Sequence, residues 1–189
     1  AHDNCAFGFK ALTANTTGTY NVGVGCSALA ANTTGDKNTA LGWQALDANT
    51  TADKNTAFGY NTLTDNTTGT RNTAIGAGAL ANSTGDDNTA VGSNCADALT
   101  TGTNNTAVGS YALTTATTGS HNTAVGFDSL KNTTTGSYNT AVGRNSLLSH
   151  TTSNSNTGIG YGALQANTTG AENTAVGGGA LTSNTTASN

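Results

Sequence analysis

One asparagine recurs along the chain at an almost constant spacing, and this period limits the folds that the chain can adopt. Asn stands at residues 4, 21, 38, 55, 72, 88, 105, 122, 139, 156 and 173, which gives nine intervals of 17 residues and one of 16, between Asn72 and Asn88. Low charge combined with many polar residues can indicate disorder, but a disordered tract has no reason to keep such a register. The period indicates eleven copies of one structural unit.

Each copy follows the same pattern when the recurring asparagine is numbered position one. Asn at position one and Gly at position five are invariant; position three is only Ala or Gly, position four is always bulky and apolar, and position nine is Leu except at Ala96. Thr, Asn and Gly supply 40, 25 and 25 of the 189 residues, and all three are poor helix formers. We therefore expect an all-β protein, a β-solenoid or β-roll of eleven 17-residue coils. It would form one domain over residues 1–189, with coils that start at the eleven asparagines.

Strand alternation predicts which side chains share a face. We expect positions two and four to point inwards, because position four and the Leu row are the only sizeable apolar rows. The Thr row would then form a buried ladder, and the Asn row, on the outer face together with position three, an amide ladder along the stack. Gly at position five would permit a positive φ at a corner. Position three would face outwards, where its small side chains would let another backbone approach; the alternative is a tight corner that forbids larger ones. The predicted subunit-packing face consists of Ala40, Ala57, Ala74, Ala90, Ala107, Ala124, Ala141 and Ala175.

Position six varies from coil to coil while its neighbours do not, which indicates exposure. Exposed aromatic side chains can stack on sugars or on partner chains, although they can also simply shield neighbouring coils. Charged residues gather at the last two positions of the coils, which we expect to form exposed turns on one edge. The candidate exposed partner contacts at position six are Phe9, Trp43, Tyr60, Phe127 and Tyr161.

Signs of catalysis and of cofactor binding are lacking in the sequence. There is no organised carboxylate pair or Ser–His–Asp set, the glycine-rich stretches have no Lys partner, and three Cys give no metal spacing. We expect no enzyme activity, no catalytic or metal-binding residues and no cofactor, with exposed histidines and with Cys5 and Cys95 buried. A net charge of −4 argues against nucleic-acid binding, and no apolar run approaches the ~18 residues needed to insert into a membrane.

The recurring N-T-A-V-G-x-x-A-L, as in Asn105–Leu113 and Asn173–Leu181, resembles the head repeats of trimeric autotransporter adhesins. It is also similar to repeats of bacterial and phage fibre proteins that end in a self-cleaving chaperone domain. The resemblance covers all eleven copies. It implies a left-handed roll, three chains side by side, and an extracellular location on a cell surface or in a virion fibre. The coil is longer than in the adhesins, and no stalk, membrane anchor or chaperone segment is recognised in this sequence.

Three functions remain open from the sequence. The first is an extracellular structural or adhesive fibre module, a rigid rod that assembles with other copies and presents its variable turns to a surface receptor or glycan. The second is ice binding by a flat Thr-rich face, which requires that a Thr row be exposed. The third is a subunit that stacks end to end into a filament, since no capping segment is recognised at either end of the sequence.

Overall fold

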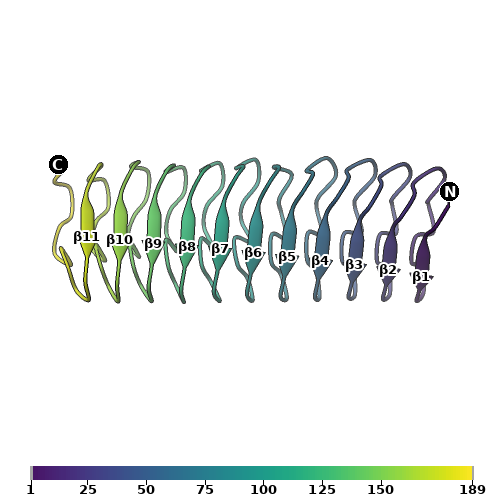
Figure 1. The fold of residues 1–189 in the computed structure, drawn as a ribbon, viewed down its shortest axis with the longest axis horizontal. Coiled ribbons are helices and arrows are strands. Elements are labelled where there is room, and N and C mark those ends of the chain that lie inside the picture. Colours follow the sequence, from purple (N-terminus) through teal and green to yellow (C-terminus); the bar gives the residue numbers. More distant parts are fainter. Residues whose placement is uncertain (1, 189) are drawn as a thin grey trace.

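The computed structural model describes residues 2–188 and shows an eleven-strand β-solenoid, a straight rod in which each coil stacks on the previous one (Figure 1). The strands run downwards on the near side of the figure while the chain advances from right to left, which is a left-handed winding. The predicted domain limits at Ala1 and Asn189 lie outside the described residues. Within residues 2–188 there is no helix with the length and apolar character to span a membrane.

Every coil contributes one three-residue strand, at positions two to four of the repeat. All strands are parallel and pair in sequence order, with Thr39 opposite Thr56 and Leu41 opposite Phe58. At ~4.8 Å per strand the eleven strands span on the order of 50 Å. The strands are β1 (Cys5–Phe7), β2 (Val22–Val24), β3 (Thr39–Leu41), β4 (Thr56–Phe58), β5 (Thr73–Ile75), β6 (Thr89–Val91), β7 (Thr106–Val108), β8 (Thr123–Val125), β9 (Thr140–Val142), β10 (Thr157–Ile159) and β11 (Thr174–Val176).

The invariant glycine at position five ends each strand and turns the chain into the lower corner, as predicted. Gly109, for example, has φ of +132°, and a Cβ added there would lie 2.6 Å from the carbonyl oxygen of Gly126 in the next coil. No side chain fits at that separation, so the corner requires glycine for both conformation and space. Corners of successive coils therefore stack backbone on backbone.

The interior is filled by the Leu row at position nine and by polar side chains at positions one and twelve. Leu113 and Leu130 are fully buried, like most of the row. At position one, the backbone N–H of Asn122 donates to Asn105 Oδ1 at 3.0 Å, and the side-chain Nδ2 of Asn122 donates to the carbonyl of Gly136 at 2.8 Å. The predicted asparagine ladder is confirmed, but its predicted place on the outer face is wrong, because these side chains are buried inside the rod. There they satisfy backbone groups that would otherwise be buried without partners.

The predicted orientation of the strands is wrong. The position-three alanines are the inward side chains, and all eight residues of the predicted packing face are buried within their own chain: Ala40, Ala57, Ala74, Ala90, Ala107, Ala124, Ala141 and Ala175. The space behind the strand is only about one methyl group deep, because a Cβ at Gly23, the equivalent position in β2, would already lie 3.3 Å from Leu12 Cγ. Larger side chains at positions two and four must therefore point outwards.

Candidate functional site

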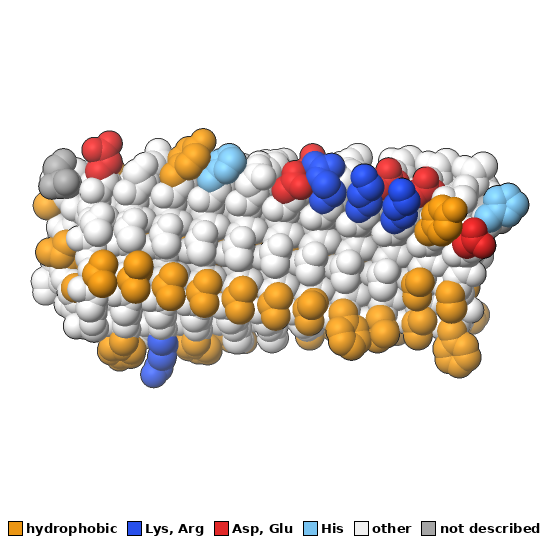
Figure 2. Space-filling view, in the orientation of Figure 1, with side chains coloured by type: hydrophobic (Ala, Val, Ile, Leu, Met, Phe, Trp, Pro, Cys, Tyr) orange, Lys and Arg blue, Asp and Glu red, His pale blue; other side chains and the backbone are white. Residues whose placement is uncertain are grey.

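The outward surface of the eleven strands is the most regular surface of the molecule, and we call it the strand face. It consists of the position-two row, which is Thr from β3 onwards, and the position-four row of Val, Ile, Leu and Phe. In Figure 2 the position-four row is the line of orange side chains along the rod. Every described member of both rows is exposed or half-buried, whereas the sequence-based prediction places both rows inside.

Threonine hydroxyls of the strand face make no hydrogen bond within the described residues. Thr106 and Thr123, for example, pair through their backbones only, and their side-chain oxygens are left for solvent or a partner. The predicted bonding along a buried Thr ladder occurs elsewhere, at position thirteen, which is Thr in all eleven coils. There the hydroxyl of Thr33 donates to the carbonyl of Thr50 at 3.0 Å.

The spacing of these free hydroxyls is close to a spacing in tetrahedrally bonded water. Neighbouring strands lie ~4.8 Å apart. Two water oxygens that are each bonded to a common third at about 2.75 Å lie about 4.5 Å apart when the arrangement is tetrahedral. A Thr row with this repeat can hold an ordered row of water molecules.

The strand face has two unlike parts. From β5 to β11 its position-two residue is always Thr and its position-four residue is always Val or Ile. In β1 to β4 the position-four residues are Phe7, Val24, Leu41 and Phe58, and Cys5 and Val22 replace two of the threonines. The part from β5 to β11 is therefore flat and repetitive, while the part from β1 to β4 is bulkier and more apolar.

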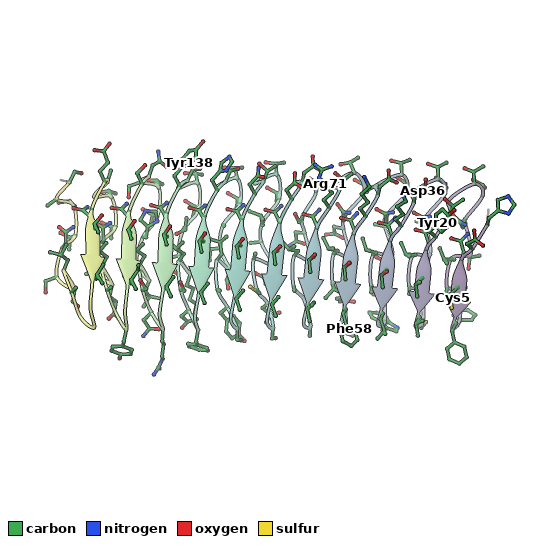
Figure 3. All side chains as sticks on the ribbon, in the orientation of Figure 1. Cys5, Tyr20, Asp36, Phe58, Arg71 and Tyr138 are labelled. Atoms are coloured by element: carbon green, nitrogen blue, oxygen red, sulfur yellow. The ribbon has the colours of Figure 1, made fainter. Side chains whose placement is uncertain are left out.

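Two edges border the strand face. The upper edge is the row at position seventeen, immediately before each position-one Asn; Figure 3 labels Tyr20, Arg71 and Tyr138 on it. The lower edge is the row at position six, beyond the far end of each strand. It carries the predicted partner-contact residues, which are all exposed: Phe9, Trp43, Tyr60, Phe127 and Tyr161.

Side chains stack along each edge from one coil to the next. Trp43 lies parallel to Tyr60 with ring centroids 5.0 Å apart on the lower edge, and His121 lies parallel to Tyr138 at 4.8 Å on the upper edge. These contacts support the alternative that position-six aromatics shield neighbouring coils, but their high exposure leaves them free for a partner as well.

Nine of the 16 charged residues lie at the last two positions of the coils, on or beside the upper edge, as predicted (Figure 2). Arg71 forms two hydrogen bonds with Asp87, at 2.6 and 2.8 Å, and this guanidinium lowers the pKa of the Asp87 carboxyl. Asp36 accepts hydrogen bonds from the backbone nitrogen and the hydroxyl of Thr19, which lower its pKa. Asp36 and Asp87 are thus held as carboxylates by contacts between coils.

Two predictions about single residues are wrong. His150, predicted to be exposed, is fully buried, because it occupies position twelve, where most coils place an inward Asn. Its Nδ1 lies 3.0 Å from Thr133 Oγ1 and its Nε2 lies 2.9 Å from Ser153 Oγ, and burial lowers its pKa to about 4. Cys5 is exposed because position two faces outwards; Cys95 is buried as predicted, and burial raises its pKa to about 12.

The described residues include no group of three or more His, Cys, Asp or Glu side chains placed to hold a metal ion. By its fold the chain is a β-solenoid repeat protein. Comparison with models of known protein families, with curated proteins and with solved structures finds no match to this chain.

Proposed function

We propose that the protein is a non-catalytic extracellular fibre module, a rigid rod that assembles side by side with other copies through its strand face. The observation that carries this proposal is the uninterrupted row of outward-facing apolar side chains at position four, from Phe7 to Val176, each of them exposed or half-buried. Soluble monomers rarely expose an apolar surface of this length, and such surfaces generally mark interaction sites. The resemblance to adhesin and fibre repeats points to the same class of protein.

In this proposal another copy covers the strand face, and the edges and the far side of the rod remain available to a receptor or glycan. The interface that we propose is therefore not the alanine row of the sequence-based prediction. It consists of the position-two and position-four rows on the outer side of the same strands. The Thr hydroxyls tolerate burial there only if they find partners across the interface or keep bridging water.

A second function, ice binding, is favoured by one specific observation. The sequence-based objection to it is that the position-two Thr row would be buried. In the structure that row faces outwards, exposed or half-buried, with free hydroxyls at a spacing close to that of tetrahedral water. The flat part of the face, β5 to β11, would bind the ice in this case, and the protein would act as a monomer.

One pair of measurements separates these functions. Light scattering over a concentration series should give a fixed multiple of the 18.6 kDa chain mass if the strand face joins copies. The variant Val125→Glu places a charge in the middle of the face and should reduce the mass to that of one chain. Thr118→Glu, at an exposed position-fourteen turn away from the strands, is the matched control and should leave the mass unchanged.

A stable monomer would contradict the assembly proposal. The wild-type protein and a Thr123→Leu variant would then be compared by thermal hysteresis. Hysteresis that falls in the variant would support ice binding, and no hysteresis in the wild type would contradict it.

A further inference from the structure

The turn at positions twelve to fifteen of the coils contains an exposed residue that never varies. Position fourteen is Thr in each of the ten 17-residue coils, and all ten side chains are exposed. The 16-residue coil lacks this position. We call these residues the outer turn row, which consists of Thr17, Thr34, Thr51, Thr68, Thr101, Thr118, Thr135, Thr152, Thr169 and Thr186.

The other residues of this turn are required by the fold, as the turn at residues 32–35 shows. Asn32 is buried, and its Nδ2 donates to the side chain of the equivalent asparagine in the preceding coil at 3.0 Å. The hydroxyl of Thr33 donates to a carbonyl of the next coil at 3.0 Å. Gly35 lies too close to the backbone of the next coil to carry a Cβ. Only Thr34 has a side chain that the coil does not use.

The fold does not explain why position fourteen is always Thr. Hydroxyls of the outer turn row make no hydrogen bond within residues 2–188. The 16-residue coil omits the position, yet β5 and β6 still pair in register, with Thr73 opposite Thr89. Position seventeen of the same corner takes eight residue types, so the coils have diverged where nothing constrains them. The constraint on position fourteen therefore comes from outside the chain.

What the outer turn row offers to a partner is one free hydroxyl per coil on an exposed turn. The described part of the chain encloses no cavity, so the row does not hold a ligand in a pocket of its own. It suits the active site of a second protein instead, as an acceptor that is accessible in each coil. Threonine hydroxyls accept phosphate and sugar groups in modified proteins.

Charge distinguishes these two modifications. Phosphate would add about −1.5 to −2 charges per coil, at a spacing of ~4.8 Å that lies within the screening length of ~8 Å. A neutral sugar causes no such repulsion and fits on every coil. It also supplies hydration that this rod lacks, because charged residues make up 8% of the chain against about 25% in typical soluble domains.

We propose that the outer turn row is a periodic O-glycosylation site, in which each Thr accepts one neutral sugar from a nucleoside-diphosphate sugar. The Thr Oγ attacks the anomeric carbon, and the new bond from this carbon to Oγ replaces its bond to the phosphate oxygen. The nucleoside diphosphate leaves, and the hydroxyl proton passes to a base of the glycosyltransferase. The modified turns are not part of the strand face, so this inference does not rest on the proposed assembly.

Trypsin makes a direct test possible, because Lys or Arg ends three successive coils. It releases residues 38–54 and 55–71 as single coils, each with one member of the row, Thr51 and Thr68. In protein purified from its natural host, we expect each of these peptides to carry one sugar. Mass spectrometry with electron-transfer fragmentation locates the modified residue.

The next tryptic peptide contains an internal control. Residues 72–131 include the 16-residue coil, which lacks position fourteen, and two coils that have it. We expect two sugars on this peptide, on Thr101 and Thr118, and none in the 16-residue coil, although that coil carries Thr84 at position thirteen.

Matched variants made in the same host separate the acceptor from its surroundings. Thr51→Val keeps the shape of the side chain but removes the hydroxyl, and it should leave the peptide of residues 38–54 unmodified. Thr51→Ser keeps a hydroxyl and should keep the sugar. Thr50→Val changes the neighbouring threonine at position thirteen and should also keep the sugar. Far-UV circular dichroism checks that each variant is folded.

Three results would overturn the inference. They are unmodified peptides from the natural host, phosphate in place of sugar, and sugars spread equally over the strand-face threonines. The oligomeric state is measured separately by light scattering. A rod that carries the sugars on the outer turn row but remains a monomer would support this inference and contradict the proposed assembly.

Discussion

Two threonine rows run the length of the rod and differ in what their hydroxyls do. In the turn row at position thirteen, most threonines donate their hydroxyls to a carbonyl of the next coil, as Thr33 does to Thr50. The strand row at position two makes no such bond, although its threonines follow the same period. The residue type is identical, so the local backbone decides whether a row holds the coils together or is offered to a partner.

The comparison extends to neighbouring residues with inward and outward side chains. Asn122 points into the rod, while Thr123, the next residue, points out of it. We expect Asn122→Ala to lower the free energy of unfolding by about 4 kcal/mol, since the backbone nitrogen of Asn139 and the carbonyl of Gly136 each lose a buried partner. Thr123→Ala should cost less than about 1 kcal/mol. Urea unfolding followed by circular dichroism measures both, and equal losses would mean that the strand row also stabilises the coil.

The pH dependence of stability tests whether His150 is buried among the inward rows. Its pKa is about 4 in the folded chain and about 6.5 when unfolded, so the unfolded state binds more protons between these values. Stability should therefore fall as the pH drops from about 6.5 to about 4, by up to about 3 kcal/mol in total, with no further loss from this group below. Melting temperatures across this range measure the effect.

The control for His150 is a return to the residue that most coils place at position twelve. His150→Asn should remove this part of the pH dependence, and the difference between the two proteins cancels the titration of other groups such as Asp47 and Asp97, whose pKa values are raised by burial. Identical pH profiles would show that His150 reaches solvent and titrates normally.

The smallest expected difference lies between the two threonine rows themselves. Thr33→Val removes a hydroxyl that bonds to the next coil, and we expect a loss of about 1 kcal/mol. Thr39→Val, in β3, removes a free hydroxyl and should change the stability by less than about 0.5 kcal/mol, since Val is a good strand former. Urea midpoints compare the two, and a larger loss from Thr39→Val would reveal a partner for the strand row.

The sequence predicts the fold well because the fold is encoded in the period. Eleven coils, the inward Leu row, the asparagine ladder and the glycine corner all follow from residues that recur at fixed positions. The orientation of the strands does not follow, because alternation allows two assignments, and hydrophobicity alone favours the one with the larger apolar side chains inside. The interior is already filled by Leu side chains from the opposite wall, which leaves room for Ala alone.

The correct orientation of the strands can be inferred from how much each position of the repeat varies between coils. Position three never exceeds Ala, as expected where space is fixed, whereas position four ranges from Val24 to Phe58, as expected at a surface. The same reasoning predicts correctly that position six is exposed. His150 shows the limit of such reasoning, because a single histidine among turn residues carries no pattern, and only its alignment with the inward asparagines of position twelve indicates burial.

The 16-residue coil, Asn72 to Asp87, has a consequence for how such a rod can change. It lacks one residue in the turn, at position fourteen. The hydrogen bonds to its neighbouring coils are nevertheless kept: the backbone N–H of Asn88 donates to Asn72 Oδ1 at 2.9 Å, and the backbone N–H of Thr84 donates to the carbonyl of Thr100 at 2.7 Å. The stack therefore tolerates a change of length at this corner without a shift of its strands. Peptides grafted between positions thirteen and fifteen would be displayed at chosen points along the rod, with each coil serving as a separate attachment site about 4.8 Å from the next.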